Sequence, residues 1–317
     1  MFIAGIDEAG YGPLLGPFTA GWSLFRIPDT KTNLWEVTSD CVAQKPGRKD
    51  RRLRIDDSKR VNTGPHGRER LERAVGAFLA MEPSLGVQLK AWLEAPPSGD
   101  RDWFKKAPWF GALPGKLCPS SDTERAHLDS TLLRRSLLAG GCTFEGFGAR
   151  AVPAGEWNQL LNTIGSKADV LFSISMEIVS HILQLSQPAP LRIEMDRHGA
   201  RRSYASRLEK VLLPDSIQIH AETQKASLYT LKWGEREVQL RFSEGADGKF
   251  FPVALASLAA KQTRERLMDL WNQWHSERFP EVRPTKGYAQ DGKRWLNDTR
   301  EGRSSLELNS ALLIRNR

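Results

Sequence analysis

The sequence predicts an α/β protein built on a β-sheet of mixed strand direction. Short apolar segments typical of buried strands alternate with longer segments whose apolar residues recur at helical spacing. Farther along the chain, two strand-like segments flank Gly234-Glu235, which is the pattern of a β-hairpin. Crossover connections join parallel strands, whereas a hairpin pairs its strands antiparallel, so both directions are expected in one sheet.

The individual elements follow from local pattern. The first strand is the apolar segment 2–6, and a turn rich in glycine and proline separates it from a second strand at 18–27. Further strands are predicted at 86–95, 143–152, 191–195, 217–220, 227–233 and 237–242. Helical spacing predicts helices at 68–81, 131–138, 167–185, 203–213, 252–274 and 291–298. The stretch 96–122, rich in Pro, Gly and Trp, is interpreted as a loop. Its aromatic residues either pack on the domain, which we favour, or stack on single-stranded nucleic acid.

The composition limits the class of protein. Of the 317 residues, 40% are hydrophobic and 26% are charged, which are the proportions of a globular protein. The formal net charge of +8 favours a polyanionic partner. The three cysteines are too widely separated for a zinc site or a disulfide framework, which fits a cytoplasmic location. The most apolar later stretch, 170–185, contains Glu177 and is interpreted as too short and too polar to span a bilayer. We therefore expect a cytoplasmic monomer without membrane association.

Two adjacent carboxylates stand at the end of the first predicted strand. Asp7 and Glu8 repel each other, and this arrangement is costly unless a cation lies between them. Gly10 and Gly12 follow directly, and glycines let backbone N–H groups approach an anionic ligand closely. The pattern predicts a metal site beside an anion-binding turn, and an ordinary polar turn is the alternative.

Two later aspartates extend this hypothesis. Asp196 ends the strand predicted at 191–195, and Asp247 lies in a Gly-Ala-Asp-Gly segment. Taken alone, each also fits a turn residue or a helix cap. Mg²⁺ prefers carboxylate and phosphate oxygens, and two such ions about 4 Å apart can activate a water and stabilise a leaving oxygen. Four carboxylates on one face would therefore suffice for metal-assisted cleavage of a phosphodiester.

Longer strings around these residues resemble a known family. Asp7-Glu8-Ala9-Gly10 and the Gly-x-Gly-Pro turn that it opens resemble the amino-terminal signature of type 2 ribonuclease H, or ribonuclease HII. Asp196 and Asp247 are similar to its third and fourth catalytic aspartates. The helix after Asp247 carries a string similar to the family's, Ala256-Ser257-Leu258-Ala259-Ala260-Lys261-Gln262-Thr263-Arg264. Two shorter motifs, Asp57-Ser58-Lys59 and Lys286-Gly287-Tyr288, also match in the family's order.

The resemblance implies a ribonuclease-H-like mixed sheet flanked by helices, and a divalent-metal-dependent endoribonuclease. Its substrate would be the RNA strand of an RNA–DNA hybrid or a ribonucleotide embedded in DNA, cut to leave 3′-hydroxyl and 5′-phosphate ends. By this resemblance the catalytic residues, which would ligate two Mg²⁺ or Mn²⁺ ions, are Asp7, Glu8, Asp196 and Asp247. The residues near the substrate phosphates would be Ser58, Lys59, Lys261 and Arg264. The residues that meet the sugar would be Gly10, Tyr11, Gly12 and Tyr288.

The chain also departs from the family. The family's turn is Gly-Arg-Gly, whereas this turn has Tyr11, and Arg197-His198 replaces the Gly-Asn that usually follows the third aspartate. The stretch 65–165 has no clear counterpart. We therefore expect a catalytic domain over 1–275 that contains this insertion, and a C-terminal extension over 276–317 that completes the substrate site. Two alternatives are a similar metal centre that acts on a different nucleic acid, and a basic nucleic-acid-binding protein without catalysis.

Overall fold

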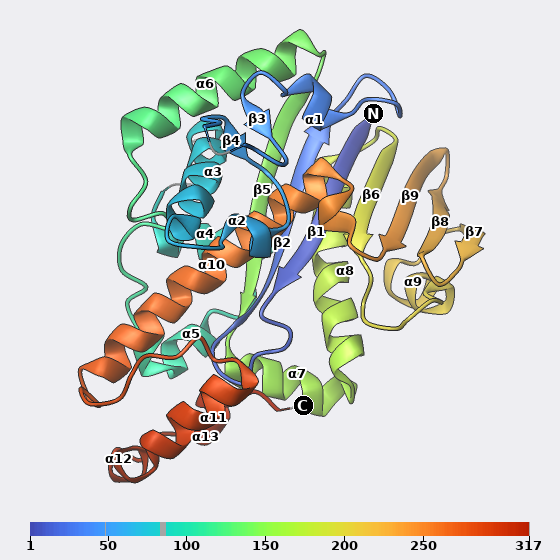
Figure 1. Ribbon diagram of the computed structural model, residues 1–317. Helices are drawn as coiled ribbons and strands as arrows, with labels where there is room; N and C mark the ends of the chain where they lie inside the picture. Colours follow the sequence, from blue (N-terminus) through green and yellow to red (C-terminus); the bar gives the residue numbers. More distant parts are fainter. Residues whose placement is uncertain (48, 83–86, 317) are drawn as a thin grey trace.

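The computed structural model describes residues 1–47, 49–82 and 87–316. Its main feature is a seven-stranded sheet in the order β5-β2-β1-β6-β9-β8-β7 (Figure 1). The strands are β1 (Phe2–Ala9), β2 (Phe18–Arg26), β5 (Thr143–Val152), β6 (Leu191–Asp196), β7 (Ser216–Glu222), β8 (Ala226–Trp233) and β9 (Arg236–Ser243). Two short strands, β3 (Val42–Ala43) and β4 (Leu53–Arg54), pair separately.

The strand directions place two of the predicted carboxylates side by side. β2 runs antiparallel to β1 and β5, β6 runs parallel to β1 and β9, and β8 runs antiparallel to β7 and β9. The mixed α/β sheet predicted from the sequence is therefore confirmed. The register of β1 and β6 pairs Ile6 with Met195, so the next residues along the two strands, Asp7 and Asp196, emerge at the same edge of the sheet.

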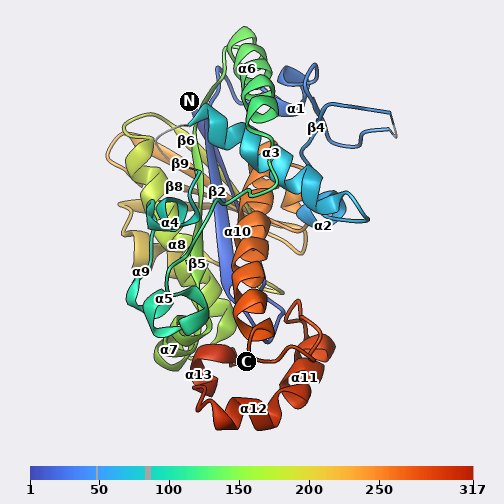
Figure 2. The same cartoon turned by 90° about the vertical axis from the view of Figure 1, so that its left-hand side faces the viewer.

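Helices cover both faces of this sheet. The α-helices are α1 (Leu34–Val37), α2 (Ser58–Val61), α3 (Gly67–Met81), α4 (Leu89–Glu94), α5 (Asp102–Lys106), α6 (Thr123–Ala139), α7 (Ala154–Ile164), α8 (Lys167–Leu185), α9 (Ala205–Leu212), α10 (Phe251–Ser276), α11 (Ala289–Asp298), α12 (Arg300–Ser305) and α13 (Ser310–Leu313). Two 3₁₀ turns are η2 (Pro108–Phe110) and η3 (Ala246–Gly248). Figure 2 shows α10 and α8 on opposite sides of the central strands, and a separate apolar core fills each side.

Two glycines bring α10 unusually close to the sheet. A Cβ atom on Gly5 would lie 2.1 Å from the backbone of Pro252 and Val253, and one on Gly21 would lie 2.1 Å from the carbonyl oxygen of Ala256. Only glycine permits this approach, because any side chain would overlap the helix backbone. The first turns of α10 are therefore pressed against β1 and β2 beside the end of β1 that carries Asp7.

Most predicted elements are found within a few residues of their expected bounds, but the strand predicted at 86–95 is wrong. Gly86 lies outside the described residues, and Leu89–Glu94 forms α4. Leu89, Trp92 and Leu93 are buried together, which is the i, i+3, i+4 spacing of one helical face. The short helix predicted at 131–138 is also longer than expected, because Asp122 caps α6 by accepting hydrogen bonds from the N–H groups of Glu124 and Arg125.

The stretch 65–165 contributes to the main sheet. Its strand β5 pairs with β2, and α3 packs against both α6 and α10. The segment 96–122, interpreted as a loop, contains α5 and η2. Within it Trp109 and Phe110 are buried, and the ring of Trp109 lies 6.5 Å from that of Trp271 in α10. This agrees with the favoured interpretation for these two rings. The proposed division at residue 275 stays a prediction.

The helix α8 qualifies the expectation about membranes. By length and by a mean hydropathy of 1.3, α8 is apolar enough to cross a membrane, contrary to the estimate made from 170–185. Half of the apolar 18-residue stretch of α8 is buried within the structure, where α8 packs on the sheet. A core helix passes the same test, so its apolar composition is explained by this packing.

Candidate active site

Four carboxylates meet at the edge of the sheet where β1 and β6 end. Asp7 and Glu8 belong to β1, Asp196 is the last residue of β6, and Asp247 lies in η3, which connects β9 to α10. Each of the charges of Asp196 and Asp247 raises the pKa of both Asp7 and Glu8, and the charge of Asp196 raises that of Asp247. The structure therefore brings together all four residues that the sequence singled out.

Burial is the largest cause of the raised pKa values of Asp7 and Glu8. Asp7 is only 8% exposed, and burial followed by the charge of Glu8 raises the pKa of Asp7 well above its usual value. Burial and the charge of Asp196 raise the pKa of Glu8 to about 7, and Lys59 opposes this rise. Both shifts mean that negative charge at this edge is poorly compensated by the protein itself.

Asp196 and Asp247 have more polar surroundings. Burial raises the pKa of Asp196, whereas the N–H of Ala246, which donates to its Oδ1 at 3.2 Å, lowers it. Burial and the charge of Asp57 raise the pKa of Asp247 to about 6. Lys59 lowers both pKa values, so one lysine is the common positive neighbour of Glu8, Asp196 and Asp247.

The donor atoms of this cluster suit a hard divalent cation. All four groups offer carboxylate oxygens, which are the ligands that Mg²⁺ and Mn²⁺ prefer, and their mutual repulsion would be relieved by positive charge. As placed, no three His, Cys, Asp or Glu side chains in the described ranges are arranged to hold one ion. The four carboxylates thus influence one another electrostatically, but they do not surround one common position in space.

The motif at residues 57–59 lies beside the cluster through α10. Ser257 of α10 makes a hydrogen bond to Asp7 that lowers the pKa of the carboxyl group. The hydroxyl oxygens of Ser257 and Ser58 lie 3.0 Å apart. Asp57 caps α2 by accepting a hydrogen bond from the N–H of Lys59 at 2.8 Å. These contacts bring Ser58 and Lys59 beside the carboxylates, and their contact with a substrate phosphate stays a prediction.

The turn of Gly10, Tyr11 and Gly12 follows β1 directly. Gly10 has a φ of +87°, and a Cβ there would lie 2.5 Å from Nε of Arg264, so glycine is required. A Cβ on Gly12 would meet nothing within 4 Å, and thus Gly12 is not required by packing. The ring of Tyr11 lies edge-on to Trp157 with 6.3 Å between centroids.

The other predicted substrate residues have more varied surroundings. Arg264 is only 1% exposed, and its Nη2 donates to the carbonyl oxygens of Lys286 at 3.0 Å and Leu15 at 3.4 Å. Its guanidinium lies 5.5 Å from the ring centroid of Tyr288, which is 47% exposed. Lys261 forms an ion pair of 2.6 Å with Glu265. Arg264 therefore supports the turn from inside, and the direct phosphate contacts expected of Arg264 and Lys261 stay predictions.

The sequence predicted no role in the site for several residues that lie near it. Asp57 is a fifth carboxylate near the cluster, since its charge raises the pKa of Asp247, although its position before Ser58 indicates only a helix cap. Lys167 lies over the ring of Tyr11 at 4.8 Å. Trp157 and Arg315 contact the turn from parts of the chain far away in sequence. No local pattern marks these last residues, because only the folded chain brings them to residues 10–13.

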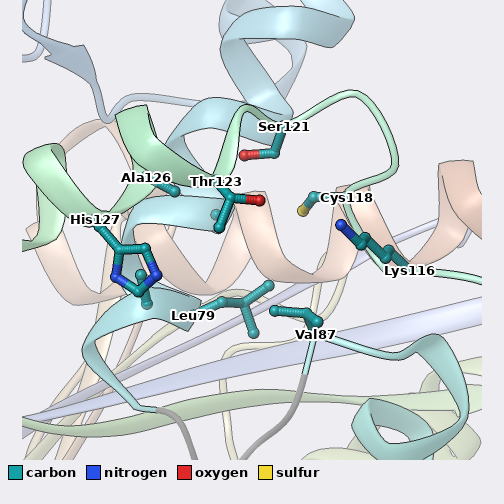
Figure 3. Close-up of a pocket in the computed structure, with 10 residues that line it drawn as sticks. Leu79, Val87, Lys116, Cys118, Ser121, Thr123, Ala126 and His127 are labelled. Carbon is teal, nitrogen blue, oxygen red and sulfur yellow. The ribbon is translucent and has the colours of Figure 1, made fainter.

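A separate cavity of about 390 Å³ lies in the stretch 65–165 (Figure 3). Side chains from α3, α6 and the segment between them line it, including Leu79, Val87, Cys118 and His127. None of the described residues that line it belongs to the carboxylate cluster or the turn. It is therefore not part of the candidate active site.

Comparisons with known proteins gave matches among solved structures only. No protein-family model and no curated protein matches the chain. Ribonuclease HII of Archaeoglobus fulgidus, solved in complex with PCNA, matches with 16% identity and a TM-score of 0.42 over 100% of this chain and 95% of that chain. Ribonuclease H2 of Pyrococcus horikoshii matches with 16% identity and a TM-score of 0.39, over 99% and 92%. Ribonuclease H3 of Aquifex aeolicus matches with 13% identity and a TM-score of 0.43, over 99% and 71%.

All three structures are ribonucleases H. Because the identities are low and the TM-scores lie below 0.5, we argue the function from the residues of the site alone.

Proposed function

We propose that the chain is a divalent-metal-dependent endonuclease. It would hydrolyse the RNA strand of RNA–DNA hybrids, or the phosphodiester at a ribonucleotide embedded in DNA, and leave 3′-hydroxyl and 5′-phosphate ends. The observation that carries this proposal is the grouping of Asp7, Glu8, Asp196 and Asp247 at one sheet edge, directly before a turn that needs glycine at position 10. In a basic protein that only binds nucleic acid, four mutually repelling carboxylates would lower stability without serving the binding.

The four carboxylates would hold Mg²⁺ or Mn²⁺. When bound there, two such ions would supply Lewis acidity to a water and to the leaving oxygen of the phosphodiester. The chain's own residues do the rest. Ser257 orients the carboxylate of Asp7 through its hydrogen bond, and Lys59 provides positive charge beside Glu8 and Asp196 for the phosphate that enters.

The turn and Tyr288 would contact the sugar next to the scissile bond. Gly10 and Gly12 leave the backbone of the turn accessible, and Tyr288 presents an exposed ring close to Arg264. Together with Tyr11, they are the residues through which a ribose 2′-hydroxyl would be distinguished from deoxyribose.

The test compares three duplexes that differ only in sugar: one with a single ribonucleotide, an RNA–DNA hybrid and an all-DNA control. Each is incubated with Mg²⁺, with Mn²⁺ or with chelator. We expect metal-dependent cleavage of the first two and only trace cleavage of the third. Equal cleavage of the all-DNA control would assign the same centre to a different substrate, and binding without any cleavage would favour the non-catalytic alternative.

The variant Asp7→Asn tests the metal assignment. It keeps the size of the side chain and removes one negative charge, so we expect cleavage to fall by about 10³-fold or more while hybrid binding is retained. Asp40→Asn, an exposed aspartate, is the control that should keep full activity. An active Asp7→Asn variant would overturn the assignment.

A further inference from the structure

The segment that follows α13 runs beneath the turn of residues 10–13. Figure 1 shows this red segment beside the blue connection between β1 and β2, and Leu15 and Ile314 form an isolated antiparallel bridge. The N–H of Arg315 donates to the carbonyl oxygen of Leu14 at 2.9 Å. The contacts therefore join two segments about 300 positions apart in the sequence.

Side chains of α7 hold this segment from the other side. Nδ2 of Asn158 donates to the carbonyl oxygens of Ala311 at 2.9 Å and Ile314 at 2.8 Å. Its Oδ1 accepts from the N–H of Asn316 at 2.7 Å, and Nε1 of Trp157 donates to the carbonyl oxygen of Asn316 at 3.2 Å. The backbone on both sides of Arg315 is thus fixed, so its side chain has a defined direction.

The side chain of Arg315 enters the interior directly under the turn. It is 3% exposed, and its Nη2 donates to the carbonyl oxygens of both Gly10 and Pro13. Its guanidinium carbon lies 5.2 Å from the ring centroid of Trp157, which also makes the edge-on contact with Tyr11. Nε and Nη1 have no hydrogen-bond partner among the described residues, which is an expensive state for a buried cation.

The guanidinium orients the backbone of the turn. The carbonyl oxygens of Gly10 and Pro13 face inward to Arg315, and that of Leu15 accepts from Arg264. Within the described part of the chain, the N–H groups of residues 10–12 donate to no other residue. With carbonyl groups held on one side, the free N–H groups are available to oxygen atoms of a ligand on the other.

We propose that Arg315 is a positioning residue that fixes the Gly10–Pro13 turn in the conformation in which its N–H groups meet the sugar-phosphate backbone at the ribonucleotide. This proposal rests on the proposed function and adds the device that sets its selectivity. Burial lowers the pKa of Arg315 to about 9, so the side chain still carries its charge at neutral pH. An arginine suits this role because the two N–H bonds of its Nη2 have fixed directions in the guanidinium plane and reach the two carbonyl oxygens.

The test replaces Arg315 by glutamine and by lysine. Arg303→Gln is the matched control, since Arg303 also donates to a backbone carbonyl oxygen, that of Leu296, but lies in α12 away from the turn. The first measurement is amide hydrogen exchange at Leu14 and Leu15, whose N–H groups donate to the carbonyl oxygen of Gly287. We expect exchange at these amides to become about tenfold faster in Arg315→Gln and to stay unchanged in Arg303→Gln.

The second measurement is the ratio of kcat/KM for the single-ribonucleotide duplex to that for the all-DNA duplex. We expect Arg315→Gln to lower this ratio by about tenfold or more at temperatures where the variant is folded, whereas a merely structural loss would lower both values alike. If Arg315→Gln does not fold, Arg315→Lys, which keeps the charge without the planar guanidinium, should show the same local exchange and the same loss of selectivity.

Unchanged exchange at Leu14 and Leu15 in a folded Arg315 variant would overturn the proposal, and so would an unchanged selectivity ratio. The exchange measurement needs no substrate. If the wild-type chain cuts none of the duplexes, the proposed function fails, while faster exchange in the variant would still show that Arg315 fixes the turn.

Discussion

Replacing Glu8 by glutamine should make the metal-free protein more stable at alkaline pH. Burial and the charge of Asp196 raise the pKa of Glu8 from its usual 4.5 to about 7, even with Lys59 nearby. The folded state therefore disfavours the ionised form of this side chain. Glutamine is neutral at every pH and has nearly the same shape, so it removes the charge with little change in packing.

The sign and the size of the expected change in the free energy of unfolding follow from the pKa values of Glu8 in the unfolded and folded states. Because the folded-state pKa is raised, the contribution of Glu8 to stability is fully present below about pH 4.5 and is lost as the pH rises through about 7. The difference between 4.5 and about 7 corresponds to about 3 kcal/mol. We expect Glu8→Gln to be more stable than the wild type by about 3 kcal/mol at pH 8, and by less than about 1 kcal/mol at pH 5. At roughly 2 °C per kcal/mol for a chain of this size, Tm at pH 8 should rise by about 6 °C.

The assay is thermal unfolding with chelator present, at pH 5 and at pH 8. Glu281→Gln, which changes an exposed glutamate, is the control and should leave Tm unchanged at both pH values. The same Glu8→Gln variant should lose cleavage in the presence of Mg²⁺, because a proposed metal ligand is lost. A variant that is no more stable than the wild type at pH 8, or that gains equally at both pH values, would refute the reasoning.

Two further predictions concern the turn and α10. Gly10→Ala should lower the free energy of unfolding by about 1 kcal/mol or more and impair cleavage, because its φ is +87° and its Cβ would meet Arg264. Gly12→Ala should change stability by less than about 0.5 kcal/mol, and equal Tm losses in the two variants would contradict this account. Ser257→Ala removes the hydrogen bond that lowers the pKa of Asp7, so the acid side of the pH–rate profile should move to higher pH. A profile that does not move would show that Ser257 has no influence on Asp7 during cleavage.

Local pattern was sufficient for most elements, whereas the four carboxylates were chosen from local pattern together with the family resemblance, and their role stays a prediction. The apolar segment that becomes β1 ends at Asp7-Glu8, and the helical spacing from residue 252 predicts nearly all of α10. Such periodicities reflect which side of an element is buried, and this is decided within a few residues. The helix α4 was missed because a segment of six residues contains less than two turns, too few to separate helical spacing from an apolar strand.

Side-chain direction on α10 required the packed structure. The helical spacing of Ser257, Lys261 and Arg264 puts them on one side of α10, but their side chains have three different environments. Ser257 contacts Asp7, Lys261 pairs with Glu265, and Arg264 is buried under the turn. The pair of Lys261 and Glu265 lies within α10 itself, whereas the contact of Ser257 depends on the close approach of α10 to β1 and β2, which glycines in these two strands permit.

The sequence by itself determined that this chain is an α/β protein with carboxylates at strand ends and a turn that needs glycine. Only the tertiary structure decided which carboxylates meet, that β5 completes the sheet beside β2, and that Arg315 reaches the turn of residues 10–13. The physical reason is the distance along the chain over which each interaction acts. Hydrophobic periodicity and turn chemistry act between near neighbours, whereas the contact between Arg315 and Gly10 spans 305 positions and joins two segments that both contact Trp157 of α7.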